Sequence, residues 1–381
     1  MTKTRTEIFQ YENLTWPEVA ALPRDLPLVI PLGEGYDLID LGAGLGNPPR
    51  LGILPAIPYG WHGSGLDVPA AVFAHFAANL VDSLRDERFS RVYFLTPSGT
   101  NLGLGDAAIA RERRATNDAL DSLQHTKVLL IPVGHTEQHG HHLPLNTDTL
   151  IIEAVAQGTA SAIPGEASAL PVMPYGVSMH RRSFAGTLNA GGRAFEDLYL
   201  AVIDSLVARG CDRIYLMSGH GGNCSFLSNI VKYAGERHRR AFIATAYGYL
   251  SGPEGVAALE KLRRSKIGGM GHACELETSL LLHLRPDLVH MDRVIDETDF
   301  VASPSYYMDW IEGGALIANP PWDDDTKTGP YGAGSLASAE HGKLWLEAAI
   351  AEKISHVREI DEQHRRREAR RSNGYGLWAK K

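Results

Sequence analysis

The sequence predicts an α/β fold built on a mainly parallel sheet, and two observations carry this prediction. Short apolar runs rich in Val, Ile and Leu alternate with helix-length segments, which is the pattern of parallel strands joined by crossover helices. Polar, chemistry-bearing residues follow directly on two of these runs, and open α/β sheets bind ligands at the carboxyl ends of their strands. The expected strands are 26–32, 90–95, 127–133, 213–218 and 241–247.

Length and composition set limits on the function. With 381 residues, 44% of them hydrophobic, the chain is long enough for two compact units. No apolar run approaches the roughly 20 residues that span a bilayer, and the amino terminus lacks the apolar stretch of a signal peptide, so we expect a cytoplasmic protein without a membrane partner. The net charge of -8 disfavours a nucleic-acid partner. Three cysteines, Cys211, Cys224 and Cys274, indicate a reducing compartment rather than a disulfide framework.

Three segments occur twice in the same order, which indicates an internal repeat. RDLPLVIPLGE (24–34) resembles HTKVLLIPVGH (125–135), and LGILPAIPYG (51–60) resembles ASALPVMPYG (167–176). The third pair is SRVYFLTPSGTN (90–101) and DRIYLMSGHGGN (212–223). Chance resemblance between strands is the alternative, but Leu-Pro-x-x-Pro-Tyr-Gly occurring twice is harder to explain by strand composition.

The two copies carry different side chains. Tyr36 and Leu38 align with Glu137 and His139 of the second copy, so the first copy lacks the polar groups. We therefore expect three parts: a degenerate half without metal ligands (1–113), the domain that carries the chemistry (114–360) and a basic tail (361–381). The basic run in the tail is interpreted as a solvated helix end, or as an arm that grips a neighbouring subunit.

The segment 134–149 holds the densest group of candidate metal ligands. Glu137 and His139 stand two apart on backbone expected to be extended, so both side chains point the same way and can converge on metal ions. Asp148 follows nine residues after His139 and can fold back as a bridging carboxylate.

Two further clusters complete the candidate site. In SGHGGN (218–223) the glycines allow a tight turn that leaves His220 exposed at a strand tip, as a ligand would be. In GHACELETS (271–279) two carboxylates, Glu275 and Glu277, stand near His272, which could handle protons while a carboxylate completes metal coordination. A satisfied polar residue at a strand end is the simpler interpretation of any one histidine, but three such clusters together favour a metal site.

Four segments in chain order resemble the creatininase, or creatinine amidohydrolase, family: EQHGHHLPLNTDT, MPYGVSMHRRSFAGTLN, SGHGGN and HACELETSLLLHLRPDLV. The resemblance covers residues 127–294 and implies a creatininase-like α/β/α layered sandwich with a mainly parallel sheet. It also implies a small-molecule substrate, a centre of two divalent ions, zinc or manganese, and a homo-oligomer, often a hexamer. The family usually has Ser, Pro and Asn where this chain has His135, His141 and Ser218, so creatinine itself is not assigned as the substrate.

The resemblance assigns roles to the ligands residue by residue. Glu137 and His220 would hold one metal ion, His139 the other, and Asp148 would bridge them. In creatininase a Glu stands two residues after the His that matches His220, but this chain has a glycine there. The carboxylate role therefore passes to Glu277 or, as the alternative, to the other Glu of the ELET segment.

The remaining roles are catalytic and substrate-binding. His272 resembles the family's catalytic histidine, and Glu275 is the second catalytic candidate. The residues expected to contact substrate are Tyr175, His180, Arg181, Thr187, Gly221, Gly222 and Asn223. The irregular segment 319–335 is long enough to act as a lid over the pocket.

These observations predict a hydrolase that opens the ring of a small polar cyclic substrate by attack of metal-activated hydroxide on a carbonyl. Two substrates stay open: a cyclic polyol diketone such as 3-dehydro-scyllo-inosose, with C–C cleavage, or a cyclic amide such as creatinine, with C–N cleavage. A dinucleotide-dependent dehydrogenase is disfavoured because Asn47 and two prolines spoil the glycine-rich fingerprint in LIDLGAGLGNPP. A non-catalytic metabolite-binding protein with a structural metal is the alternative from another class.

Overall fold

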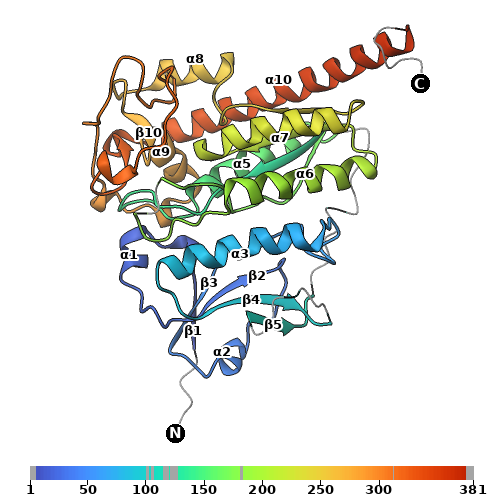
Figure 1. The fold of residues 1–381 in the computed structure, drawn as a ribbon. Coiled ribbons are helices and arrows are strands. Elements are labelled where there is room, and N and C mark those ends of the chain that lie inside the picture. Colours follow the sequence, from blue (N-terminus) through green and yellow to red (C-terminus); the bar gives the residue numbers. More distant parts are fainter. Residues whose placement is uncertain are drawn as a thin grey trace.

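Two parallel sheets organise the chain in the computed structural model, which describes residues 6–99, 103, 107–114, 120, 128–180, 183–311 and 313–374 (Figure 1). The first sheet has the order β1-β3-β2-β4-β5 and the second β7-β6-β8-β9. The strands are β1 (Glu7–Gln10), β2 (Leu28–Pro31), β3 (Arg50–Ile53), β4 (Val92–Pro97), β5 (Ala108–Arg111), β6 (Val128–Val133), β7 (Ala167–Ala169), β8 (Arg213–Ser218) and β9 (Phe242–Thr245). All five expected strands are confirmed as members of these sheets.

Helices cover both faces of the second sheet. α6 and α7 lie on the side that faces the first unit, and α5, α9 and α10 lie on the other side (Figure 1). The larger helices are α3 (Ala70–Asp86), α5 (Thr147–Ala162), α6 (Gly192–Ala208), α7 (Cys224–Arg237), α8 (Pro253–Leu262), α9 (Glu275–Leu284) and α10 (Ala339–Ser372), with short helices α1 (Trp16–Ala20) and α2 (Leu41–Gly44). A small antiparallel pair joins β10 (Met270–His272) to β11 (Tyr331–Gly332). This architecture confirms the predicted layered α/β fold.

The sheet and helix sequences explain their burial. β6 reads VLLIPV and is buried along its whole length, as expected of a central parallel strand covered on both faces. In α3 the buried residues Phe73, Phe76, Ala77, Leu80 and Leu84 recur at helical spacing and form one apolar stripe.

Among the described residues, every helix is too short or too polar to span a bilayer.

The two sheets share the arrangement that the predicted repeat requires. The order β3-β2-β4 in the first sheet corresponds to β7-β6-β8 in the second. The backbone bond from Leu54 N to Val29 O has a counterpart from Leu170 N to Leu130 O, both 2.9 Å long and both at aligned positions. These correspondences support the repeat, and the common origin of the two units stays a prediction.

The unit without ligands packs on the second unit through one continuous core. α3 lies along α6, and buried side chains of both units belong to a single apolar cluster (Figure 1). Leu198 on α6 approaches Gly60 of the first unit closely, and the Tyr175 hydroxyl donates to Pro55 O at 2.6 Å. The first unit is therefore part of the folded body of the protein.

The predicted basic tail, 361–381, begins inside α10, which runs from Ala339 to Ser372, so the basic run continues this helix. No Gly or Pro interrupts the sequence between residues 343 and 373, so the helix continues through the basic run. Asp361 accepts from Arg213 at 2.5 Å and His364 Nε2 lies 3.2 Å from Arg240 O, which fixes this part of the helix to the body. Residues 375–381 lie outside the described chain.

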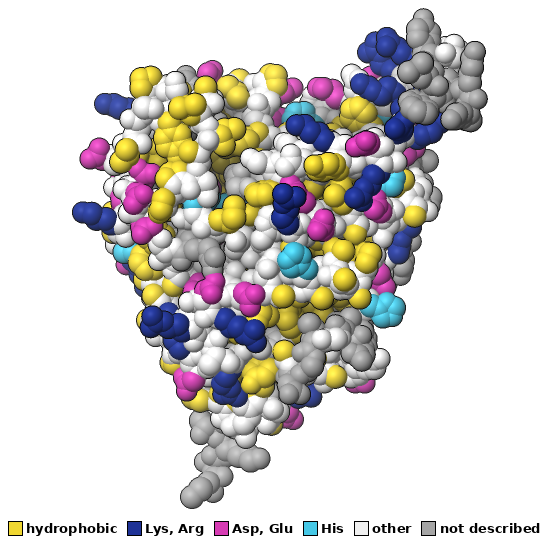
Figure 2. All heavy atoms as spheres, viewed as in Figure 1, with side chains coloured by type: hydrophobic (Ala, Val, Ile, Leu, Met, Phe, Trp, Pro, Cys, Tyr) yellow, Lys and Arg dark blue, Asp and Glu magenta, His cyan; other side chains and the backbone are white. Residues whose placement is uncertain are grey.

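Surface charge agrees with the composition. Figure 2 shows basic and acidic side chains interspersed over the face in view, with one group of basic side chains at the far end of α10. This face therefore offers no broad positive surface of the kind that binds nucleic acid.

The shared core predicts that the two units unfold together. Leu198→Ala should lower the free energy of unfolding by about 2–5 kcal/mol, because it removes a buried side chain at the junction. Ile317→Ala, at an exposed position, should change it by less than about 0.5 kcal/mol. Urea unfolding followed by circular dichroism measures both. Two separate transitions, with only one of them moved by Leu198→Ala, would contradict a shared core.

Candidate metal centre

Four elements bring the predicted ligands together. The loop after β6 supplies Glu137 and His139, the first turn of α5 supplies Asp148, and the end of β8 supplies His220. The first turn of α9 adds a carboxylate, Glu277, and all five side chains are buried. Because the carboxyl ends of neighbouring parallel strands meet at one sheet edge, residues far apart in sequence converge here.

Close packing between two of these elements depends on a glycine. A Cβ at Gly219 would lie 2.3 Å from Asp148 O and 3.0 Å from the Cβ of Ile152. Any larger residue would push the end of β8 away from α5. The glycine beside His220 therefore serves to bring this histidine against the acidic end of the helix.

Two histidines are oriented by backbone carbonyls. His139 Nδ1 lies 3.1 Å from Glu137 O, and His220 Nε2 lies 3.0 Å from Val177 O. A carbonyl oxygen can only accept, so each of these ring nitrogens carries a proton and donates it. The opposite nitrogen of each ring faces the carboxylates, which is the usual arrangement of a histidine that binds metal.

Asp148 lies between these two rings. Its Oδ1 is 3.2 Å from His139 Nε2, and its Oδ2 is 3.3 Å from His220 Nδ1. Burial alone would raise the pKa of Asp148, but the facing imidazoles hold it below its usual range. Burial alone would lower the pKa of both histidines, but the neighbouring carboxylates, Asp148 and Glu137 foremost, raise each to about 9. In the metal-free protein a proton on each ring thus occupies the position that a cation would take.

The remaining carboxylates complete two overlapping groups of ligand atoms. Glu137 Oε1 lies 2.9 Å from His220 Nδ1, and Glu277 Oε1 lies 3.9 Å from His139 Nε2. The described residues contain three sets whose ligand atoms lie within 4.8 Å of one another: His135, Glu137 and His220; Glu137, His139 and His272; and His139, Asp148 and Glu277. Imidazole nitrogens with carboxylate oxygens suit zinc and manganese, so the residues fit the predicted metals.

His272 and Gln138 form a buried pair beside the cluster. His272 Nε2 lies 2.7 Å from Gln138 O and 3.1 Å from its side-chain Nε2. The shorter contact is with a carbonyl, which fixes the proton on Nε2 and leaves Nδ1 as the acceptor. Nδ1 lies 3.8 Å from Glu137 Oε1, so this nitrogen of His272 faces the candidate metal site.

The geometry does not support the catalytic role expected for Glu275. Its carboxylate accepts from the backbone nitrogens of Arg264 and Ser265, at distances from 2.7 to 3.2 Å, on the other side of α9. It therefore holds the segment that follows α8. Of the two alternatives left open by the sequence, Glu277 is the one that the helix presents to the histidines.

Comparison with known proteins agrees with the site. The creatininase family, described as creatinine amidohydrolase, matches residues 112–357. The chain belongs to the creatininase family. Creatinine amidohydrolase of Pseudomonas putida is 30% identical over 61% of this chain and 89% of its own length. The 3-dehydro-scyllo-inosose hydrolase of Thermotoga maritima is 28% identical over 64% of this chain and 80% of its own length.

A third relative and two solved structures extend the comparison. The mycofactocin precursor peptide peptidase of Mycobacterium ulcerans is 36% identical, over 44% of this chain and 62% of the peptidase. A creatininase in its manganese form and a mutant creatininase of Zn-Zn type each show 28% identity and a TM-score of 0.51, over 61% of this chain. They cover 91% and 90% of their own chains, respectively. Family members of this fold are thus named as manganese and zinc forms.

Several residues predicted to contact substrate in this creatininase-family chain are engaged elsewhere. The Tyr175 hydroxyl is buried against Pro55 of the first unit. Asn223 is buried, accepts from Val177 N at 2.9 Å and donates to Gly134 O at 3.1 Å, so it holds two loops together. Both side chains therefore hold neighbouring segments of the chain together.

The other predicted contacts lie nearer to the cluster. Thr187 Oγ1 accepts from Gln138 N at 3.1 Å, and the ring of His180 packs 5.2 Å from Trp322. Gly222 adjoins the His220 ring, where a Cβ would lie 2.4 Å from Nε2, and Gly221 is exposed beside it. Arg181 lies outside the described residues.

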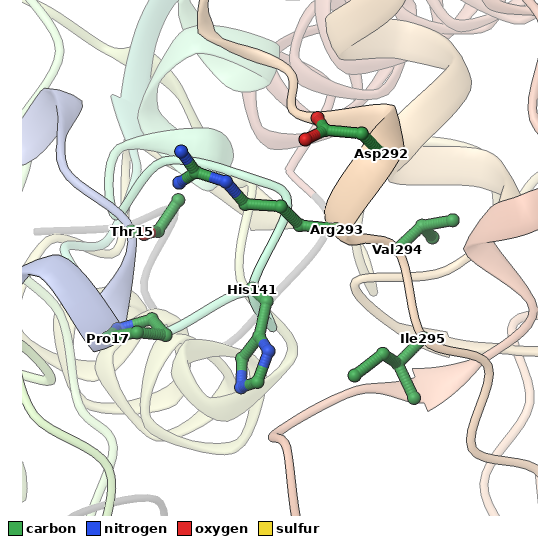
Figure 3. A pocket seen from close by; sticks show the side chains of 7 residues that line it. All are labelled: Thr15, Pro17, His141, Asp292, Arg293, Val294 and Ile295. Carbon is green, nitrogen blue, oxygen red and sulfur yellow. The ribbon is translucent and has the colours of Figure 1, made fainter.

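The first unit lines a pocket beside the segment that carries the candidate ligands. A pocket of about 470 Å³ is lined by Thr15 and Pro17 of that unit together with His141 and the segment 292–295 (Figure 3). The ring of Trp16 lies 5.1 Å from that of His141, and Arg293 pairs with Glu18 at 3.0 Å. No local motif marks these residues, because their role arises from contacts between distant parts of the chain.

The two glutamates of α9 give a matched test of the ligand set. Glu277→Gln should weaken zinc binding by at least about tenfold, because it removes a charged ligand. Glu275→Gln should leave zinc affinity unchanged and lower the free energy of unfolding by about 1–3 kcal/mol, because it weakens hydrogen bonds to the backbone. Calorimetric titration and urea unfolding measure the two effects. The reverse pattern would show that the ligand is Glu275.

Metal uptake should displace protons. With pKa values of about 9, His139 and His220 are protonated at pH 7 in the metal-free protein, so zinc binding at that pH should release about two protons. Zinc affinity should therefore rise with pH and level off above pH 9. Titration in two buffers of different ionisation enthalpy counts the protons. Affinity that is constant from pH 6 to 9 would rule out these histidines as ligands.

Proposed function

We propose that this chain is a two-metal hydrolase that cleaves a bond next to a carbonyl group in a small polar substrate. The observation that carries the proposal is the position of Asp148, whose two oxygens face two different histidines at 3.2 and 3.3 Å. A carboxylate in this position suits a bridge between two cations. His220 and Glu137 would hold one cation, and His139 and Glu277 the other.

The donor set favours a catalytic over a structural metal. Structural zinc sites usually close around four Cys and His ligands, whereas here carboxylates predominate and leave room for water. Divalent cations held in this way lower the pKa of water toward 7 and polarise a carbonyl group. Cys274 lies beside the cluster, with its Sγ 3.9 Å from Glu277 Oε2, and is buried with a raised pKa, so it stays a neutral thiol.

His272 is the residue best placed to move a proton. Its Nε2 is anchored on Gln138 O, and its Nδ1 faces the cluster as an acceptor. It can take a proton at Nδ1 from an attacking water and return it to the leaving group. The ring keeps its orientation throughout because the anchoring bond involves the other nitrogen.

Aromatic side chains close the site on the side of the predicted lid. Trp322 is buried, donates from Nε1 to Gly329 O at 2.7 Å and packs edge-on 5.7 Å from the His272 ring. Phe184 and Tyr331 belong to the same apolar cluster. This wall excludes bulk water from His272 and supports the lid role proposed for 319–335.

The relatives divide over which bond is broken. Creatinine amidohydrolase and the peptide peptidase are named for amide substrates, so an amide with C–N cleavage is the leading candidate. The 3-dehydro-scyllo-inosose hydrolase keeps a cyclic polyol diketone with C–C cleavage as the second candidate. Both need an electrophilic carbonyl and the same proton transfer.

Turnover on a small panel tests the function. Zinc-loaded, manganese-loaded and chelator-treated protein would be assayed on creatinine, a formamide, a short peptide amide and 3-dehydro-scyllo-inosose. One compound should be consumed only by a metal-loaded form, and Glu137→Gln should abolish turnover because a ligand charge is lost. Glu254→Gln, at an exposed position on α8, is the control and should leave activity unchanged.

The outcome separates catalysis from binding alone. If the chelated protein stays folded but inactive, the metal is catalytic. If chelation unfolds the protein and no compound reacts, the protein is a metabolite-binding protein with a structural metal, and the proposal is wrong.

A further inference from the structure

The histidines around the metal centre are of two kinds. His139, His220 and His272 each place one ring nitrogen against a backbone carbonyl, at 3.1, 3.0 and 2.7 Å. Each carbonyl fixes a proton on that nitrogen, so the opposite nitrogen is the one that can bind metal or exchange a proton with the cluster. A metal ligand or a general base needs its ring proton in this position.

His135 has the opposite arrangement, because its hydrogen bond to the backbone fixes an unprotonated nitrogen. Its Nδ1 lies 3.0 Å from the backbone nitrogen of Gly176, which can only donate a proton. Nδ1 must therefore offer its lone pair, and the neutral ring carries its proton on Nε2. The ring is fully buried and packs on that of His220, with centroids 4.4 Å apart, and turning it over would break the hydrogen bond from Gly176.

The partner of Nε2 is a carboxylate of the metal centre. His135 Nε2 lies 3.9 Å from Glu137 Oε2, while the other oxygen of Glu137 faces His220 Nδ1 at 2.9 Å. The two oxygens of Glu137 are thus held from opposite sides by two histidines. One histidine presents an N–H and the other a nitrogen that can bind metal.

Proximity alone would make His135 a metal ligand, because its Nε2 lies within 4.8 Å of ligand atoms of Glu137 and His220. Metal at Nε2 would require a lone pair there while Nδ1 also offers one to the Gly176 N–H. A ring with no proton on either nitrogen is an anion, which neutral imidazole does not form at ordinary pH. The hydrogen bond from Gly176 therefore excludes His135 from the ligand set.

The position of the Gly176 N–H is fixed by its surroundings. Asn223 accepts from the next backbone nitrogen, that of Val177, and donates to Gly134 O beside His135. A Cβ at Gly176 would lie 2.3 Å from Asn223 Oδ1, so the backbone at Gly176 and the asparagine are in close contact. Buried Asn223 thus fixes the position of the Gly176 N–H. This N–H determines which ring nitrogen of His135 carries the proton.

We propose that His135 is a positioning residue whose Nε2–H faces Glu137 Oε2 at 3.9 Å and so keeps Glu137 Oε1 directed at the metal site. The inference rests on the proposed function, in which Glu137 is a metal ligand. An imidazole N–H at this distance directs the carboxylate without competing for the cation. Second contacts of this kind typically change metal affinity by about 10- to 100-fold.

Two substitutions of His135 separate its hydrogen bond with Gly176 from its contact with Glu137. The amide oxygen of His135→Asn can replace Nδ1 and accept from Gly176, but its side chain is too short to reach Glu137. The amide NH₂ of His135→Gln can replace Nε2 and donate to Glu137. The proposal predicts that His135→Asn weakens zinc binding by about 10- to 100-fold and that His135→Gln restores most of the loss.

The ring itself gives a readout that needs neither metal nor substrate. Nitrogen-15 NMR of selectively labelled histidine in the metal-free protein should show His135 protonated at Nε2 and unprotonated at Nδ1. The same pattern should persist after zinc is added, whereas His139 and His220 should lose their cluster-facing protons.

These experiments distinguish failure of the positioning role from failure of the proposed function. If the wild-type protein does not bind zinc, the proposed function fails, and the tautomer of His135 is still measured. A proton on Nδ1, or a zinc-induced loss of the proton on Nε2, would overturn the positioning role. Equal loss of zinc affinity in His135→Asn and His135→Gln, with both variants stably folded, would also overturn it.

Discussion

The buried carboxylate of Asp148, held between His139 and His220, is the constraint on which the rest of the site depends. Burying a charge without partners is costly, so this carboxylate needs both imidazoles or the cations that replace their protons. That requirement fixes the start of α5 against the end of β8, where Gly219 allows the close approach. The arrangement of sheet, helix and loop at this edge follows from satisfying one acidic group.

The first unit contributes to the same constraint although it carries none of the ligands. Its segment 12–14 binds the loop that precedes Asp148: Leu145 N donates to Leu14 O at 2.9 Å, and Asn146 N donates to Glu12 O at 3.1 Å. The unit thus holds the loop that carries the candidate ligands, and it also supplies a wall of the neighbouring pocket. A sheet without chemistry of its own can therefore be retained for positioning.

The convergence of the candidate ligands could be predicted from sequence because each follows a strand or starts a helix, where local pattern determines direction. The choice between Glu275 and Glu277 could not be made, since two residues apart on a helix are about 200° apart around its axis, and the sequence does not show which face turns inward. Tyr175 and Asn223 were expected at the substrate, but contacts with distant residues, Pro55 among them, engage both.

Other predictions depended on features that local pattern does not contain. The length of α10 was not predicted: the basic run was interpreted as a solvated helix end, and it forms helix as readily as the preceding turns of α10. Which ring nitrogen of His135 carries the proton depends on one backbone N–H, that of Gly176, 41 positions along the chain. The homo-oligomer and the cytoplasmic location stay predictions.

The most direct test of the account is the number of metal ions bound by the wild-type protein and by Asp148→Asn, measured by calorimetric titration and elemental analysis. A bridging carboxylate predicts two ions per chain in the wild type and weakened binding of both ions in the variant. A variant that keeps one ion at wild-type affinity would show that Asp148 serves a single site, and it would contradict the two-metal centre described above.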